Sequence, residues 1–385
     1  MVAALIRKPE GAGRADRFGP AAAPVLVVKV GSSLLVAPDG TVRRDWAASL
    51  AADIAACRAQ GQKLVLVSSG AIALGSRRLG LARGGRASLE DAQAAAACGQ
   101  ILLAGLWAEL LGAHGLAAAQ MLVTLGDFED RRRYLNAAAT LGRLLALGAV
   151  PVLNENDSVA TEEIRFGDND RLAARVAQAA QADALILLSA VEGLFTADPA
   201  HDAAARLVAD VHDLSAVAGM AAASSRSGLG SGGMAAKVEA ARIARAAGVA
   251  TAIAGGLAPH PLARFLESGH GTVFHAEGGL AARKAWLAGR MRVAGRLAVD
   301  AGAVAALRAG RSLLPAGVVA VEGAFARGDA VDVAGPDGRL VARGLASYDA
   351  REARAIAGRQ SEAIAAILGY APRAAMIHRD QMVML

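Results

Sequence analysis

Short apolar runs alternate with longer segments of helical spacing from Val25 to about Phe274. Six of the runs predict strands: Val25–Val30, Lys63–Val67, Gln120–Val123, Val150–Leu153, Ala184–Leu188 and Val249–Ile253. Between the strands, five segments predict helices, four of them followed by a glycine suited to a C-terminal cap: Arg43–Gln60, Leu89–Leu111, Tyr134–Leu147, Asp170–Ala180 and Met234–Ala247. This alternation predicts a three-layer α/β/α fold, in which helices cover both faces of a mostly parallel sheet.

The pattern changes after Phe274, which indicates a second domain in this chain of 385 residues. Glycine breaks and basic residues predict a linker over 276–292. Three shorter strand-like runs separated by turn signals then predict a small β-rich domain over 293–385: Val318–Glu322, Ala330–Val333 and Arg339–Ala342. The first domain is expected over 25–275. Residues 1–24 mix charges with an apolar run too short for a signal peptide, so we expect a disordered extension there.

Composition narrows the class of protein. Cys57 and Cys98 are the only cysteines and lie far apart, which fits a reducing cytoplasm and excludes a disulfide framework. The longest uncharged run, Ala246–Ala263, contains two prolines and a glycine pair, so we expect no membrane segment. A net charge of +6 suits nucleic acid or anionic metabolites equally, and an aromatic content of 3% leaves few rings for base stacking.

A glycine-dense loop, Ser227–Lys237, runs into an Ala-rich helix with a lysine in its first turn. Backbone amides at a helix start attract anions and the lysine adds a positive charge, so the loop predicts a phosphate site. Three of its glycines match the dinucleotide fingerprint, but that fingerprint requires a strand directly upstream, and none is predicted there. A Walker loop is excluded because Ala236 precedes Lys237 and Val238 follows it.

Polar residues follow the predicted strands at their carboxyl ends, where open α/β sheets bind ligands. They are Lys29 and Gly31 after the first strand, Ser69 and Gly70 after the second, Asn154-Glu155-Asn156-Asp157, and Gly167-Asp168-Asn169-Asp170 at a helix start. Together they suit phosphoryl transfer, in which two lysines approach the phosphoryl group and an acidic residue orients them or a magnesium ion. Taken singly, each has a plainer explanation, such as a solvated lysine, a helix N-terminal acid or a turn.

These segments, taken in order, resemble the glutamate-phosphorylating kinases of the amino acid kinase family. The matching stretches are Val27–Ser33, Val67–Ile72, Asn154–Asp157, Gly167–Asp170 and Ser227–Lys237, and Gly193–Pro199 looks like the nucleotide-side segment of that family. The second domain resembles a PUA domain through Ser312–Gly317, Phe325–Gly328 and His378–Asp380. The resemblance covers nearly everything after the first 24 residues.

The resemblance implies ATP-dependent phosphorylation of the side-chain carboxylate of L-glutamate, the first step of proline synthesis. It implies Lys29 and Lys237 as the groups that stabilise the phosphoryl, held by Asp170. The implied glutamate-binding residues are Ser69, Gly70, Asn154, Asp157, Asp168 and Asn169. The implied nucleotide-binding residues are Lys29, Ser189, Ala190, Ser231, Gly232, Gly233, Met234, Ala235, Ala236 and Lys237. Magnesium, feedback inhibition by proline, homo-oligomerisation and RNA binding by the PUA-like domain are further expectations, and no metal ligand is assigned.

One departure from the family pattern concerns the nucleotide side. Ser189-Ala190 stands where the family usually has Thr-Asp, so a carboxylate is lost there, and Glu192 is a candidate substitute. Two alternatives stay open. One is a kinase for a related acceptor such as aspartate, N-acetylglutamate or UMP. The other is an RNA-binding or regulatory protein with a decayed kinase site, against which the intact Lys29, Lys237, Asp168 and Asp170 argue.

Overall fold

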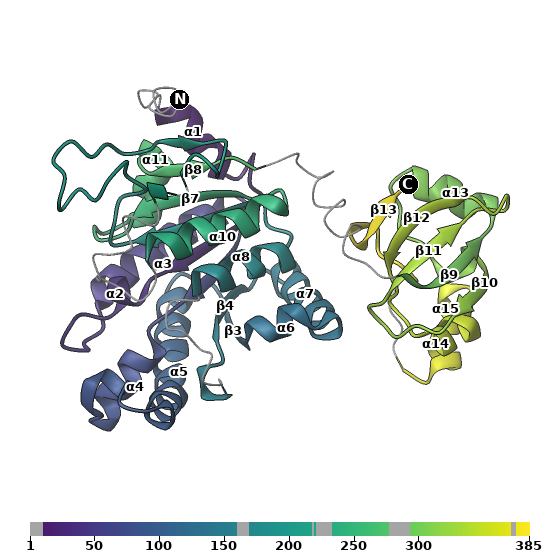
Figure 1. Ribbon diagram of the computed structural model, residues 1–385. Coiled ribbons are helices and arrows are strands. Elements are labelled where there is room, and N and C mark those ends of the chain that lie inside the picture. Colours follow the sequence, from purple (N-terminus) through teal and green to yellow (C-terminus); the bar gives the residue numbers. More distant parts are fainter. Residues whose placement is uncertain (1–10, 160–168, 218, 221–232, 277–292, 371–374) are drawn as a thin grey trace. The chain divides into compact units, whose positions relative to one another are not determined.

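The computed structural model describes residues 11–159, 169–217, 219–220, 233–276, 293–370 and 375–385. The chain divides into two compact units, Met1–Asp130 with Asn136–Glu277, and Arg131–Leu135 with Gly278–Leu385. Each unit has its own sheet and its own hydrophobic core (Figure 1).

The N-terminal unit is built on an eight-stranded sheet in the order β3-β4-β2-β1-β5-β7-β8-β6. Its strands are β1 Val25–Val30, β2 Lys63–Ser68, β3 Ala118–Val123, β4 Val150–Glu155, β5 Ala184–Ser189, β6 Asp210–Val211, β7 Ala250–Gly255 and β8 Thr272–Phe274. Neighbouring strands are parallel except β7 and β8, which are antiparallel. The predicted α/β fold with a mostly parallel sheet is confirmed.

Helices cover both faces of this sheet (Figure 1). On one face lie α3 Arg44–Ala59, α4 Ala71–Leu79, α5 Leu89–Gly112 and α11 Pro261–Ser268, and on the other lie α8 Asn169–Ala179 and α10 Met234–Ala246. Right-handed crossovers explain the division, because the strand order extends from β1 to β2 in one direction and from β4 to β5 and β7 in the other. The shorter or peripheral elements are α1 Gly11–Ala15, α2 Ser32–Leu35, α6 Leu125–Glu129, α7 Arg131–Ala146 and the 3₁₀ turns Asp16–Phe18, Ala82–Gly85 and Asp157–Val159.

The pleat of β1 decides which way its lysine points. Leu26, Val28 and Val30 belong to the core cluster that includes residues of α3, α5 and α11. Successive side chains of a strand point to opposite faces, so Lys29 points to the face covered by α8 and α10. A lysine in an otherwise apolar strand is therefore directed to the face where its partners lie.

Helix α5 has the length and apolar composition of a membrane span, and it is the only such helix in the described part of the chain. Half of its most apolar window is buried within the N-terminal unit. Its backbone meets that of α4 so closely that a Cβ on Gly75 would lie 1.8 Å from the oxygen of Ala95, and one on Gly99 would lie 1.7 Å from the oxygen of Ala71. Two glycines thus bring α5 into direct contact with α4, the helix that follows β2.

The segment before β1 corrects one prediction. Residues 11–24 are not a disordered extension, because Phe18 is fully buried and packs edge-on against Phe265 of α11 with ring centroids 5.1 Å apart. The buried Gln62 fastens the same segment, since its Nε2 donates to the oxygens of Phe18 and Ala23 at 2.7 and 2.8 Å. The ring of Phe265 and the side-chain amide of Gln62 thus hold a segment whose mixed charges had suggested disorder. Residues 1–10 lie outside the described part.

The C-terminal unit contains a five-stranded sheet in the order β10-β9-β11-β12-β13. Its elements are β9 Val293–Val299, α13 Ala301–Arg308, a 3₁₀ turn Pro315–Gly317, β10 Val318–Gly323, β11 Ala330–Ala334, β12 Leu340–Leu345, α14 Ala350–Ile356, α15 Ser361–Leu368, a 3₁₀ turn Arg379–Gln381 and β13 Met382–Met384. The three predicted strands correspond to β10, β11 and β12, while β9, β13 and the helices were not predicted. Of the predicted linker, residues 277–292 lie outside the described part.

We expect Gly99→Ala to lower the free energy of unfolding by about 1–3 kcal/mol, because overpacking costs that much and the new methyl overlaps a backbone carbonyl. Gly105→Ala on the same helix is the control. No atom lies within 4 Å of its added methyl, and replacing a helix-interior glycine should stabilise by about 0.5–1 kcal/mol. Urea unfolding of the full chain measures both, and equal effects would contradict the close contact of α4 and α5.

Candidate active site

One carboxylate holds two lysines at the carboxyl edge of the sheet. Lys29 comes from β1, Asp170 from the first turn of α8 and Lys237 from the first turn of α10. Lys29 Nζ lies 2.6 Å from Oδ1 of Asp170, and Lys237 Nζ donates to Oδ2 at 3.0 Å. All three side chains are buried, and Asp170 has no exposed surface. The structure therefore brings together the three residues predicted as catalytic.

The charges of this cluster do not cancel. Burial raises the pKa of the Asp170 carboxyl, but the two ammonium groups outweigh it and hold that pKa below its usual value. Burial is also the largest influence on Lys29 and lowers the pKa of its ammonium, an effect that Asp170 opposes and Lys237 reinforces. With both lysines protonated the cluster carries one net positive charge in a buried setting, which favours an anionic ligand.

Polar contacts beside the cluster connect α8, β2 and β1. The side-chain Nδ2 of Asn169 donates to Oγ of Ser69 at 2.8 Å, and the backbone N of Ser69 donates to the oxygen of Val30 at 3.2 Å. These two bonds connect the start of α8 with the ends of β2 and β1. Gly70, which precedes α4, has φ +119°, and a Cβ there would lie 3.3 Å from Cγ2 of Val36. Ser69, Gly70 and Asn169, all predicted as glutamate-binding, are thus brought together.

Two amide oxygens of the predicted glutamate-binding residues lack partners. Oδ1 of Asn154, near the end of β4, and Oδ1 of Asn169 are buried, and neither accepts a hydrogen bond within the part of the chain that the structure describes. Buried acceptors are usually satisfied, so an unpaired pair of them is expected where a ligand donates. Asp157 follows in the 3₁₀ turn after β4, and burial raises the pKa of its carboxyl to about 6. Asp168 lies outside the described residues.

The residues predicted to bind the nucleotide occupy two places. Ser189 ends β5 and is buried, while Ala190 after it is exposed. Gly233 precedes α10, and Met234, Ala235, Ala236 and Lys237 form the first turn of that helix. Ser231 and Gly232 lie outside the described part of the chain.

A pocket of about 640 Å³ lies beside Ala190 and is lined also by Glu192, Gly255, Leu257, Arg264 and His270. Glu192, the candidate substitute for the missing carboxylate, lies in this pocket. Its Oε2 is 3.0 Å from Nε2 of His270. Glu192 is therefore paired with a histidine in the structure.

Helix α5 contributes two residues that were not singled out. Trp107 Nε1 donates to Oγ of Ser68 at 3.0 Å, and Gln100 Nε2 donates to the backbone oxygen of Glu155 at 3.0 Å. Both bonds hold the ends of strands that carry the site. A signal existed for Gln100, which is the only charged or amide side chain between Gln93 and Glu109.

Comparison with known proteins gives the family. The model of the amino acid kinase family matches residues 24–254, and the model of the PUA domain matches residues 295–368. The chain belongs to the amino acid kinase family.

The glutamate 5-kinase of Sphingopyxis alaskensis is 62% identical over 368 residues, which cover 96% of this chain and 99% of that protein. That of Novosphingobium aromaticivorans is 60% identical over 362 residues, covering 94% and 96%. Within its family, the chain belongs to the glutamate 5-kinases, with a PUA domain near its C-terminal end. A solved UMP kinase from Bacillus anthracis has a TM-score of 0.46 at 15% identity, over 66% of this chain and 97% of that one.

The described residues include no group of three or more His, Cys, Asp or Glu side chains that could hold a metal ion. Asp170 is the carboxylate of the central cluster, and both of its oxygens face lysines. Magnesium commonly takes one or two protein carboxylates and completes its shell with substrate phosphates and water. The described residues do not form a cage of protein ligands, so a magnesium ion here would have to be held chiefly by the phosphates of a nucleotide.

We expect Asp170→Asn to lower the free energy of unfolding by about 3 kcal/mol, because it leaves two buried ammonium groups without a counter-charge. Lys29→Met removes a charge from the same cluster but leaves a neutral Asp170–Lys237 pair, so its loss should be smaller. Urea unfolding at neutral pH compares the two variants. An Asp170→Asn protein as stable as Lys29→Met would show that the carboxylate does not balance the lysines.

Proposed function

We propose that the Lys29–Asp170–Lys237 cluster is the centre at which this chain transfers the γ-phosphoryl group of ATP to the side-chain carboxylate of L-glutamate. The product is L-glutamyl 5-phosphate, and the reaction is the first step of proline biosynthesis. The observation that carries the proposal is the single buried carboxylate that holds both lysines, at 2.6 and 3.0 Å, in a chain of the glutamate 5-kinase family.

The chemistry needs positioning and charge neutralisation more than it needs a base. A carboxylate oxygen of glutamate forms the new bond to phosphorus while the bond from phosphorus to the bridging oxygen breaks, and ADP leaves with that electron pair. The acceptor is already an anion, so no proton has to be removed. Lys29 and Lys237 stabilise the charge on the phosphoryl oxygens, and Asp170 fixes both ammonium groups in place.

The glutamate half of the site is proposed around the unpaired acceptors. Oδ1 of Asn154 and Oδ1 of Asn169 can accept from the substrate ammonium, and the Asp157 carboxylate adds a charge of the right sign. Ser69, which accepts a hydrogen bond from Asn169, and the adjacent Gly70 complete this half, to which we also assign Asp168. The nucleotide half is assigned to Lys29, Ser189, Ala190 and the 231–237 segment, where the start of α10 offers backbone N–H groups to phosphate.

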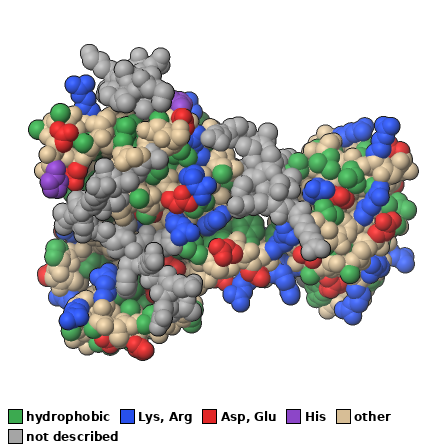
Figure 2. All heavy atoms as spheres, viewed as in Figure 1, with side chains coloured by type: hydrophobic (Ala, Val, Ile, Leu, Met, Phe, Trp, Pro, Cys, Tyr) green, Lys and Arg blue, Asp and Glu red, His purple; other side chains and the backbone are tan. Residues whose placement is uncertain are grey.

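Several finer expectations remain predictions. Magnesium, bound with ATP, would neutralise phosphate charge. The domain bounds 25–275 and 293–385, cytoplasmic location, homo-oligomerisation and feedback inhibition by proline rest on the sequence and on the family. For RNA binding, the face of the C-terminal unit shown in Figure 2 carries scattered Arg side chains with acidic ones between them, so no described patch there favours it.

The direct test is ADP release with L-glutamate, run beside L-aspartate, N-acetylglutamate, UMP and no acceptor, with hydroxylamine present to trap an acyl phosphate. We expect release and hydroxamate with glutamate alone. Lys237→Met should lower kcat by about 100- to 1000-fold, as the loss of one group that stabilises transition-state charge commonly does.

Lys63→Met is the control for the loss of a lysine. Lys63 begins β2 at the amino edge of the sheet and its side chain is exposed, so this variant should keep full activity. Turnover with another acceptor would replace the proposed substrate. Full activity of Lys237→Met would remove that lysine from the mechanism.

The pKa of Asp157 predicts a pH dependence. Between its ordinary value of 3.8 and about 6, the folded protein holds a proton on this carboxyl that the unfolded chain has released. As pH falls through about 6, the site loses the charge that attracts the substrate ammonium, and kcat/KM for glutamate should fall toward tenfold per pH unit. Stability changes in the opposite sense, since the buried charge costs stability as pH rises through about 6.

The matched variant is Asp157→Asn, measured over the same pH range. It should have a lower kcat/KM for glutamate at neutral pH and lack the acid limb near 6. An unchanged acid limb in this variant would assign the titration to another group.

A further inference from the structure

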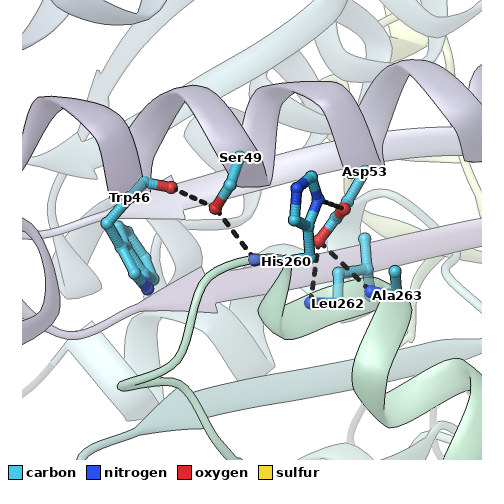
Figure 3. A network of polar contacts seen from close by, with 6 residues as sticks. All are labelled: Trp46, Ser49, Asp53, His260, Leu262 and Ala263. Carbon is cyan, nitrogen blue, oxygen red and sulfur yellow. Dashed lines mark hydrogen bonds and ion pairs between the residues drawn. The ribbon is translucent and has the colours of Figure 1, made fainter.

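Three side chains on one face of α3 fasten the loop that joins β7 to α11 (Figure 3). Trp46 Nε1 donates to the backbone oxygen of Gly256 at 2.7 Å, at the start of the loop. Ser49 Oγ accepts from the backbone N of His260 at 2.9 Å, at its end. Asp53 Oδ2 accepts from the N–H groups of residues 262 and 263, at 3.1 and 3.2 Å. Both ends of the 256–260 loop are therefore tied to one helix.

The contact of Asp53 with His260 involves an unusual backbone conformation. His260 has φ +55° and precedes α11, a conformation that few non-glycine residues adopt. Its Nδ1 lies 2.7 Å from Oδ1 of Asp53, whose side chain is only 3% exposed. Asp53 thus satisfies free N–H groups at the start of α11, the task that a residue next to the helix normally performs. The carboxylate comes from a helix about 200 residues away in the sequence.

The fastened loop touches two segments of the proposed nucleotide site, the end of β5 and the turn that follows Lys29. Gly256 N donates to the oxygen of Ser189 at 2.7 Å, at the end of β5. A Cβ on Gly256 would lie 2.5 Å from Cδ1 of Leu34, in the short helix that follows Gly31. Gly256 is therefore in contact with the turn after Lys29 and with the strand end that carries Ala190. A shift of this loop would move both.

We propose that Trp46, Ser49 and Asp53, here named the α3 brace, are positioning residues for nucleotide binding. The inference rests on the proposed function, because it takes the turn after Lys29 and the end of β5 as nucleotide-binding. None of its three residues is among those assigned to ATP or to glutamate. It holds the 256–260 loop, and the loop holds the two segments by direct packing and by one backbone hydrogen bond. Leu257 and Ala258 of the loop also line the pocket beside Ala190.

The hydrogen bond and the packing contact of Gly256 in this loop both end on segments beside the nucleotide half of the site. Trp46, Leu34 and residues of α11 belong to the core cluster under α3 and α5. Asn169 and Asp170 begin α8, on the opposite face of the sheet. Loosening the brace should therefore affect ATP more than glutamate.

The test compares Ser49→Ala and Asp53→Asn with wild type in the full chain. We expect KM for ATP to rise by about 3- to 30-fold, the range of coupling that mutations in a packed network commonly produce, with KM for glutamate changed less than about 2-fold. Calorimetric binding of a non-hydrolysable ATP analogue should show the same weakening without turnover.

Gln62→Leu is the control for a merely structural role. Gln62 is fully buried and, like Asp53, holds a distant segment through two hydrogen bonds, but it lies at the amino edge of the sheet. This variant should lose thermal stability and keep the KM for ATP. If Asp53→Asn behaves as Gln62→Leu does, or raises both KM values equally, the brace is not a positioning device.

Hydrogen exchange tests the role of the α3 brace independently of the proposed activity. In Asp53→Asn, faster exchange should begin at Leu262 and Ala263 and extend to residues 32–36. Exchange that stays confined to α11 would overturn the inference. A wild-type chain that forms no hydroxamate would sink the proposed function instead, and the exchange pattern would still report on the brace.

Discussion

The buried carboxylate of Asp170 is the constraint on which the site depends. Two ammonium groups within 3.0 Å of it come from strands and helices far apart in the sequence, so their approach fixes β1, α8 and α10 against one another. The pleat of β1 makes this possible, because Lys29 has the opposite parity to the three core residues of that strand. With both lysines protonated the buried cluster has a net positive charge, which suits a centre for phosphate better than a structural ion pair.

The two faces of the sheet contribute differently to the site. The face under α8 and α10 carries the charged groups, while the face under α3, α5 and α11 carries the hydrogen bonds that hold strand ends and loops in position. Trp107 to Ser68 and Trp46 to Gly256 are examples from that second face. Each ties a helix to the carboxyl edge of the sheet, and the carboxyl edge of a parallel sheet is where chemistry takes place. The apolar core thus supports the geometry of a polar site.

Local patterns predicted what depends on local sequence. The bounds of β1 and the start of α10 match the structure. Strand ends and helix starts predicted that the lysines meet an acidic residue of 168–170, and the family resemblance singled out Asp170. Long-range contacts were not predictable in this way. The contact of Asp53 with His260 joins residues 207 apart, and the burial of Phe18 depends on a ring in α11. Neither contact produces a periodic pattern in the sequence from which it could be predicted.

The presence of Ala190, where the family usually has aspartate, changes a side chain and leaves the backbone contacts of β5 in place. The end of β5 is positioned by the bond from Gly256 N to the oxygen of Ser189, which does not depend on the side chain at residue 190. Ala190 is exposed, so the substitution neither opens a cavity nor strands a buried partner. What the chain loses is one carboxylate charge. Glu192, the candidate substitute, is paired with His270 in the structure.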